Sequence, residues 1–169
     1  MSVHQLNEAI EQSGILEWGA GYFHIDNKGH VVCTPQKKLG AKVSLHEVVL
    51  GAKAQGFHTP MIVRFPQIIK EQMSSMHQSF KNATKEFQYN GSHYGVFPFK
   101  VNQRREFIDS IIACGRDLHW GLEVGSKTEF MAALSYRMGK NALLICNGFK
   151  DREFIEIAFI ASAIGKKTI

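Results

Sequence analysis

Residues 120–129 read WGLEVGSKTE and decide the fold of this chain. The first five residues form a short, mainly apolar run, and Ser126 with Glu129 then gives the Ser-x-x-Glu pattern that caps a helix. A strand that passes directly into a capped helix is typical of βα folds, in which neighbouring strands run parallel. We therefore predict a strand over 120–124 and a helix from 126 to about 139.

The same order of strand and helix repeats on both sides of this segment. Residues 94–101 and 142–146 predict further strands, and residues 107–115 and 152–164 carry the apolar spacing of helices. Residues 166–169 predict the beginning of a fourth strand. This alternation favours right-handed crossovers, so the carboxyl ends of the strands should lie along one edge of a parallel sheet.

The amino-terminal part has a different pattern. Residues 22–25 and 30–33 flank the turn sequence Asp26-Asn27-Lys28-Gly29, which predicts a β-hairpin. A connector follows, with a short helix expected over 44–51.

A strand over residues 61–65 and a helix beginning at Pro66 are expected next. We expect one apolar face of this helix to point into the core, namely Ile69, Met73, Met76 and Phe80.

Composition limits the function classes. The 169 residues, 44% of them hydrophobic, suffice for a core but not for a closed eight-stranded βα barrel, which takes about 250 residues. The net charge of +5 comes from interspersed charges without a basic run, so no nucleic-acid partner is expected. No segment resembles a signal peptide or membrane span, so we expect no membrane partner. Cys33, Cys114 and Cys146 are widely spaced, which indicates reduced thiols, a cytoplasmic location and no metal site.

Lys100 is the first candidate for chemistry because it follows an apolar run. Desolvation against Phe97, Phe99 and Val101 would lower the pKa of its ammonium group and free the amine to attack an aldehyde cofactor. Pro98 favours a bulge just before the lysine, which would re-aim its side chain. The alternative is an ordinary lysine at a strand end with its charge in water.

Further polar side chains follow the other strands. Glu123 interrupts an apolar run, Ser126 begins a helix and Asn147-Gly148 turns the chain. At a shared sheet edge, Lys100 and Glu123 could form an ion pair that orients the amine. The alternative is that Ser126 only caps its helix and Asn147 only forms a turn.

Several motifs resemble those of the biosynthetic arginine decarboxylases, which are pyridoxal-phosphate enzymes of the alanine-racemase-like barrel group. They are GVFPFKVNQ at 95–103, GLEVGSK at 121–127 and ICNGFKDRE at 145–153. The sequences WGAGYF at 18–23 and RFPQII at 64–69 extend the similarity over nearly the whole chain.

The resemblance implies an α/β fold in which residues 58–169 form the first βα units of a (β/α)8 TIM-like barrel. Residues 1–57 would be an amino-terminal segment whose hairpin belongs to the β domain. It implies decarboxylation of L-arginine to agmatine and CO2 in polyamine and spermidine biosynthesis. Lys100 would be the catalytic residue, bound to pyridoxal 5'-phosphate as a Schiff base.

Three further positions match cofactor-binding positions of the group, namely Glu123, Ser126 and Asn147. The family also allows magnesium, for which this sequence offers no visible site, and the full-length family is expected to be a homo-oligomer.

The family is several times longer than this chain, so the resemblance implies an amino-terminal fragment that is inactive alone. An open sheet edge and an exposed apolar helix over 154–164 predict marginal stability and association. A small non-catalytic carrier or regulator that binds pyridoxal phosphate is one alternative. A non-enzymatic interaction protein with a basic surface is another.

Overall fold

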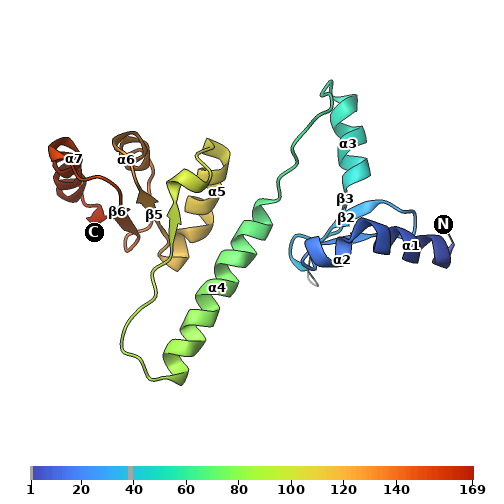
Figure 1. Cartoon of the computed structure of the whole chain (residues 1–169), viewed down its shortest axis with the longest axis horizontal. Coiled ribbons are helices and arrows are strands. Elements are labelled where there is room, and N and C mark those ends of the chain that lie inside the picture. Colours follow the sequence, from blue (N-terminus) through green and yellow to red (C-terminus); the bar gives the residue numbers. More distant parts are fainter. Residues whose placement is uncertain (1, 38–39) are drawn as a thin grey trace. The chain divides into compact units, whose positions relative to one another are not determined.

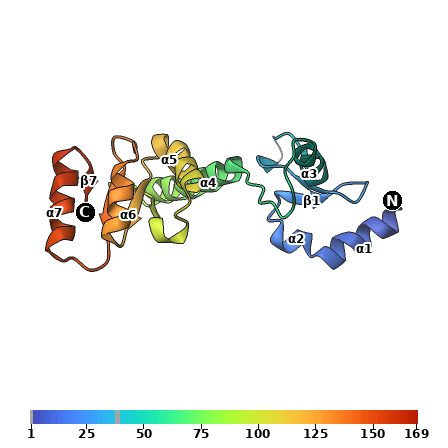
Figure 2. The same cartoon turned by 90° about the horizontal axis from the view of Figure 1, so that it is seen from above.

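The amino-terminal unit contains the predicted hairpin. The structure is a computed structural model that describes residues 2–37 and 40–169 (Figures 1 and 2). Two compact units are formed, Met1–Ile68 and Ile69–Ile169, and we call the second the sheet unit. The domain boundary expected from the sequence, between residues 57 and 58, stays a prediction.

Strands β1 (Phe23–Ile25) and β2 (Val31–Cys33) pair antiparallel, which confirms the hairpin. Its turn is stabilised by the Asp26 carboxylate, which accepts hydrogen bonds from the backbone N–H groups of Lys28 and His30. A third strand, β3 (Val43–Ser44), was not predicted and pairs with β2.

Three helices accompany this small sheet. Helix α3 (Leu45–Ala54) confirms the predicted short helix and packs against β2 and β3 (Figure 2). Helices α1 (Val3–Ser13) and α2 (Ile15–Trp18) precede the hairpin. The core of the unit contains Ile15, Tyr22, Val32 and Cys33.

The strand predicted over residues 61–65 is wrong, because this segment forms neither a strand nor a helix. Its side chains Ile62 and Val63 are exposed, so its apolar character does not reflect a buried strand.

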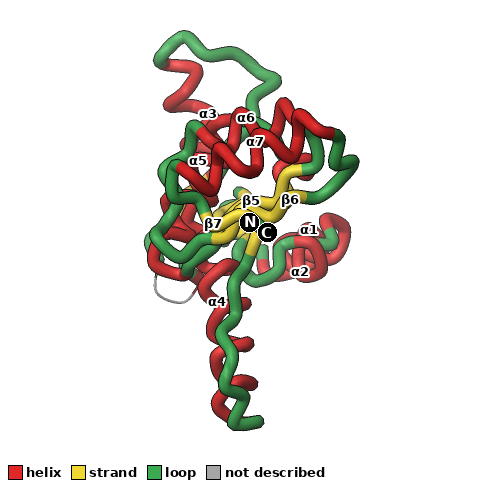
Figure 3. Tube along the Cα trace, turned by 90° about the vertical axis from the view of Figure 1, so that its left-hand side faces the viewer, coloured by secondary structure: helices red, strands yellow, loops and turns green. Residues whose placement is uncertain are grey.

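The sheet unit confirms the predicted α/β arrangement. Its four parallel strands lie in sequence order: β4 (Val96–Pro98), β5 (Gly121–Val124), β6 (Leu143–Cys146) and β7 (Lys167–Thr168). Helices α5 (Arg105–Gly115), α6 (Lys127–Leu134) and α7 (Arg152–Ala163) connect them. All three cover one face of the sheet (Figure 3). Two short 3₁₀ helices, η2 (Phe99–Val101) and η3 (Arg116–Leu118), complete the crossovers.

Strand alternation builds the core on the helix-covered face. Leu122 and Val124 of β5 and Leu144 of β6 point toward the helices and are fully buried. They pack with Ile108 of α5, Phe130 of α6 and Phe154 of α7. The residue between Leu122 and Val124 therefore points to the opposite face of the sheet, which places Glu123 there.

Helix α4 (Pro66–Glu86) confirms the predicted helix but not its whole apolar face. Met73 is buried against Ile111 and Trp120, and Ile69 packs beside them. Met76 and Phe80 are about half exposed, which corrects the expectation that they face the core. Neither side chain belongs to the buried core clusters of the described residues, and Phe80 instead stacks on the ring of His93.

The predicted exposure of apolar residues on α7 is confirmed. Ile155, Phe159, Ile160 and Ile164, just after its end, are exposed while Phe154 and Ala161 are buried. The marginal stability that we expect from this face stays a prediction.

Candidate functional site

The carboxyl ends of β4, β5 and β6 lie side by side and gather the candidate residues. Pro98 is in register with Glu123, and Glu123 is in register with Ile145. Lys100 lies two residues beyond Pro98, and Asn147 lies two residues beyond Ile145. The sheet register thus brings three of the four candidates to one edge, as the alternation of strands and helices predicted.

Glu123 and Asn147 form a hydrogen-bonded pair at this edge. Glu123 is only 8% exposed, and its Oε1 accepts a hydrogen bond of 2.7 Å from Nδ2 of Asn147. Asn147 is fixed in turn, because its backbone N–H donates to the carbonyl of Val124 at 2.8 Å. Its Oδ1 accepts from the N–H of Gly148 at 2.7 Å. A nearly buried carboxylate therefore has a fixed orientation, and no cationic partner lies beside it among the described residues.

Lys100 lies in a different local structure from the one predicted. Strand β4 ends at Pro98, and residues 99–101 form the 3₁₀ helix η2, so the strand alternation expected through Val101 is wrong. Phe99 is buried in the core, as expected, whereas Val101 is 67% exposed. The Lys100 side chain is itself exposed, which corrects the expected desolvation of its amine.

The expected ion pair between Lys100 and Glu123 is absent among the residues that the structure describes. Lys100 has no ion pair or hydrogen bond within residues 2–37 and 40–169. The amine is therefore free of competing partners, and Glu123 uses Asn147 instead.

Ser126 caps helix α6 as predicted. Its Oγ accepts a hydrogen bond of 3.2 Å from the backbone N–H of Glu129. In a capping box the side chain of Glu129 would accept a hydrogen bond from the N–H of Ser126. Its Oε2 instead accepts from the N–H of Gly125, one residue earlier, at 2.7 Å. A serine hydroxyl that accepts a bond keeps its own proton available, so Ser126 retains a donor at the edge.

Gly148 allows the loops after β5 and β6 to touch. Its φ of +84° lies in the left-handed region, and a Cβ added to it would lie 2.3 Å from the carbonyl oxygen of Gly125. Only glycine combines this backbone conformation with this approach. The Asn147-Gly148 turn thus reverses the chain and also allows the loops after β5 and β6 to contact each other.

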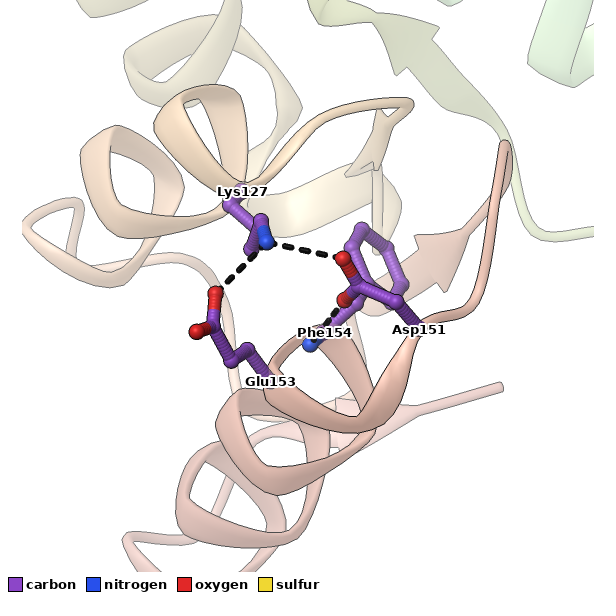
Figure 4. Close-up of polar contacts among 4 residues, drawn as sticks. All are labelled: Lys127, Asp151, Glu153 and Phe154. Carbon is purple, nitrogen blue, oxygen red and sulfur yellow. Dashed lines mark hydrogen bonds and ion pairs between the residues drawn. The ribbon is translucent and has the colours of Figure 1, made fainter.

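A charge cluster connects the beginnings of α6 and α7 (Figure 4). The ammonium group of Lys127 lies 2.8 Å from Oδ2 of Asp151 and 2.6 Å from Oε2 of Glu153. Asp151 also caps α7 by accepting from the N–H of Phe154 at 2.9 Å. Hydrogen bonds to Asp151 and Glu153 raise the pKa of Lys127 to about 12. The same Lys127 contact, with the Phe154 N–H, lowers the pKa of Asp151.

These pKa shifts predict how the stability of the sheet unit depends on pH. The contribution of Asp151 is complete above its ordinary pKa of 3.8 and is lost as the pH falls below that value. The contribution of Lys127 is complete below its ordinary pKa of 10.5 and is lost as the pH rises through about 12. We expect Lys127→Met to lower the urea midpoint slightly near neutral pH, with little difference remaining at about pH 2.

Lys140→Met is the control for this measurement, because Lys140 is exposed and has no ion pair in the described part of the chain. Its effect on the midpoint should be the same at both pH values. A Lys127→Met difference that persists unchanged in acid would contradict the role assigned to the charge cluster.

Comparison with known proteins identifies the family. A family model described as "Pyridoxal-dependent decarboxylase, pyridoxal binding domain" matches residues 70–165. The chain belongs to the pyridoxal-dependent decarboxylases. The matched range of this decarboxylase domain contains Lys100, Glu123, Ser126 and Asn147.

The resemblance to biosynthetic arginine decarboxylases is confirmed within this decarboxylase family. The chain is 38% identical to the biosynthetic arginine decarboxylase of Prochlorococcus marinus and 37% identical to that of a Synechococcus species. Each match covers 92% of this chain and 24% of the relative. The crystal structure of the Campylobacter jejuni enzyme matches with a TM-score of 0.82 at 36% identity, covering 92% of this chain and 25% of that one. The chain thus spans about a quarter of the length of these decarboxylases.

Across residues 2–37 and 40–169, no group of three or more His, Cys, Asp or Glu side chains is arranged to hold a metal ion. None of the described helices has both the length and the apolar character needed to cross a bilayer.

Proposed function

We propose that this chain supplies the cofactor-bearing part of an enzyme that decarboxylates L-arginine to agmatine and CO2. The observation that carries the proposal is the identity of 38% with biosynthetic arginine decarboxylases over 92% of the chain. The motifs that surround Lys100, Glu123 and Asn147 lie within that similarity, and the sheet register brings these residues to one edge. Since the chain covers 24% of the relative, we propose that it does not turn over arginine alone.

We propose Lys100 as the residue that would hold pyridoxal phosphate covalently. Three observations fit this role: the amine is exposed, it lies at the carboxyl end of β4, and it has no competing partner among the described residues. The role requires that the amine act as a nucleophile toward an aldehyde. Because the side chain is exposed, water can accept the proton that the ammonium group must release.

The other three residues are proposed to line the cofactor site. Glu123 can hold a positive charge near the edge, because its carboxylate is almost buried and its orientation is fixed by Asn147. Ser126 can donate its hydroxyl proton to an anionic group. Pyridoxal phosphate, when bound, accepts the electron pair that is left when CO2 departs. The contribution of these residues is to bind and orient.

We assign no role to magnesium, since the described residues contain no group of side chains suited to a metal ion. A homo-oligomer is proposed by family resemblance. The free thiols of Cys33, Cys114 and Cys146 support the proposed cytoplasmic location.

The test of the cofactor site is reduction of the chain with borohydride in the presence of pyridoxal phosphate, followed by peptide mass mapping. We expect label at Lys100 in the parent chain and complete loss of that label in Lys100→Ala. The matched control is Lys150→Ala, because Lys150 is an exposed lysine near the same edge that donates to the carbonyl of Gly148. The control should retain label at Lys100.

Label spread over surface lysines, or unchanged in Lys100→Ala, would contradict the proposed site. Release of CO2 from labelled arginine separates the catalytic proposal from its alternative. Specific label without CO2 release, even when the remaining part of the enzyme is supplied by a relative, would instead indicate a carrier of pyridoxal phosphate.

A further inference from the structure

We propose that a cavity at the amino-terminal edge of the parallel sheet binds a small organic anion, a carboxylate or phosphate that carries an apolar group. The cavity has a volume of about 430 Å³ and lies at the opposite end of the strands from Lys100. Helix α4 contributes His77 and Lys81, and the segments that precede β4, β5 and β6 contribute His93, His119 and Asn141. This inference does not depend on the proposed decarboxylase activity.

The polar groups of the cavity are hydrogen-bond donors. Lys81 is the one charged side chain that lines it among the described residues, and no carboxylate lines it there. The oxygen of the Asn141 amide is already used, because Oδ1 accepts from Nζ of Lys167 at 2.9 Å. Its NH₂ group therefore remains for a ligand. Hydroxyl groups complete the lining, from Thr84, Ser92 and Tyr94.

The three histidines add further donors. In His77, His93 and His119 the Nδ1 atom is buried and has no hydrogen-bond partner among the described residues. The Nε2 atoms of the same rings are not among the buried atoms that lack a partner. Placing a proton on a buried Nδ1 without an acceptor is costly, so the neutral rings favour the tautomer with the proton on Nε2. Each ring then offers an accessible N–H. A ligand with several oxygen acceptors and a negative charge matches this set of donors.

An apolar pocket adjoins the donors and accounts for the second part of the ligand. It shares Thr84, Ser92 and His93 with the cavity and is otherwise formed by aromatic and small side chains. Phe80 stacks on His93 with ring centroids 4.0 Å apart and an interplanar angle of 4°. The remaining lining residues are Ala83, Phe87 and Tyr89. When the anionic group of the ligand binds to the donors, the apolar part of the ligand would pack against these rings.

Binding should strengthen as the pH falls. Burial and the charge of nearby His77 lower the pKa of His93. A bound anion favours the protonated imidazole, so binding and proton uptake are coupled. The charged and titratable groups that line the cavity are His77 and Lys81 from α4, His93 and Tyr94 before β4, and His119 before β5. Lys167 contacts the lining through its hydrogen bond to Asn141.

The test is isothermal titration calorimetry on the 169-residue chain with benzoate, phenyl phosphate and inorganic phosphate, and with neutral benzamide as the uncharged control. We expect benzoate or phenyl phosphate to bind at least about tenfold more tightly than benzamide. Benzoate, whose charge is the same at both pH values, should bind more tightly at about pH 6 than at about pH 8. Comparison of benzoate with phenyl phosphate separates the two anionic groups. Comparison of phenyl phosphate with inorganic phosphate measures how much the apolar phenyl group contributes to the affinity.

Two variants connect the binding to this cavity. Lys81→Gln should weaken the anion by about tenfold, whereas Lys85→Gln, one turn later on α4 and outside the lining, should leave it unchanged. His119→Asn removes one imidazole, and asparagine tolerates the left-handed backbone of this position, whose φ is +57°. It should weaken binding of the anion, because one hydrogen-bond donor of the cavity is lost. Equal affinity for benzamide, no binding of either aromatic anion, or insensitivity to Lys81→Gln would overturn the proposal.

Discussion

Phe154→Ala is expected to destabilise the sheet unit by about 3–5 kcal/mol. Phe154 is 1% exposed, and its ring lies 5.3 Å from that of Phe130 in the core between α6, α7 and the sheet. Truncation removes the ring and leaves a cavity that the surrounding strands cannot fill. Because the whole stability of a domain is about 5–15 kcal/mol, a large fraction of it would be lost. Urea unfolding followed by far-ultraviolet circular dichroism measures the change.

The control for this measurement is Phe159→Ala on the same helix. Phe159 is 71% exposed, so its replacement should change the free energy of unfolding by less than about 0.5 kcal/mol. Both variants remove the same ring from α7, and only burial differs. Equal losses in the free energy of unfolding of the two variants would mean that burial of Phe154 does not hold α7 against the sheet.

Gly148→Ala is expected to cost about 2–5 kcal/mol, as the sum of a backbone effect and a steric effect. At a φ of +84° an alanine is strained, and its Cβ would also lie 2.3 Å from the carbonyl oxygen of Gly125. A backbone oxygen cannot rotate away, so one of the two loops must move. Because Asn147 precedes Gly148, the hydrogen bond to Glu123 should weaken as well. Urea unfolding again gives the free energy.

Gly165→Ala separates the two effects. Gly165 has a φ of +86°, and apart from its two chain neighbours no described residue has an atom within 4 Å of an added Cβ. This variant therefore reports the backbone cost alone, about 1–2 kcal/mol. A loss at Gly148 no larger than the loss at Gly165 would show that the contact between the loops after β5 and β6 carries no stability.

Much of the sheet unit could be predicted because local signals agree with tertiary structure there. The Ser-x-x-Glu pattern at Ser126 predicts a helix cap, and Ser126 caps α6 in the structure. The register that gathers Lys100, Glu123 and Asn147 follows from parallel strands alone. These features depend on neighbours in the chain or on a repeating pattern.

The errors concern residues whose environment is set by distant parts of the chain. The run around Lys100 looks like a strand throughout, yet Phe99 turns into the core and leaves Val101 exposed. The partner of Glu123 is an amide 24 residues away, and no spacing rule selects Asn147 over Lys100. The beginning of α4 at Pro66 follows from sequence, whereas the exclusion of Met76 and Phe80 from the core depends on packing against distant parts of the chain.

The short segment that carries Lys100 is attached on both sides. Phe99 is buried before it, and after it Nε2 of Gln103 donates to Oε1 of Glu129 at 2.9 Å. The other oxygen of Glu129 holds the N–H of Gly125 in the next loop. The mobility of the Lys100 amine therefore comes from rotation about the bonds of its own side chain. Fixing it to a cofactor would cost the rotamer entropy of a single lysine, about 2 kcal/mol, without the larger entropy of ordering a loop.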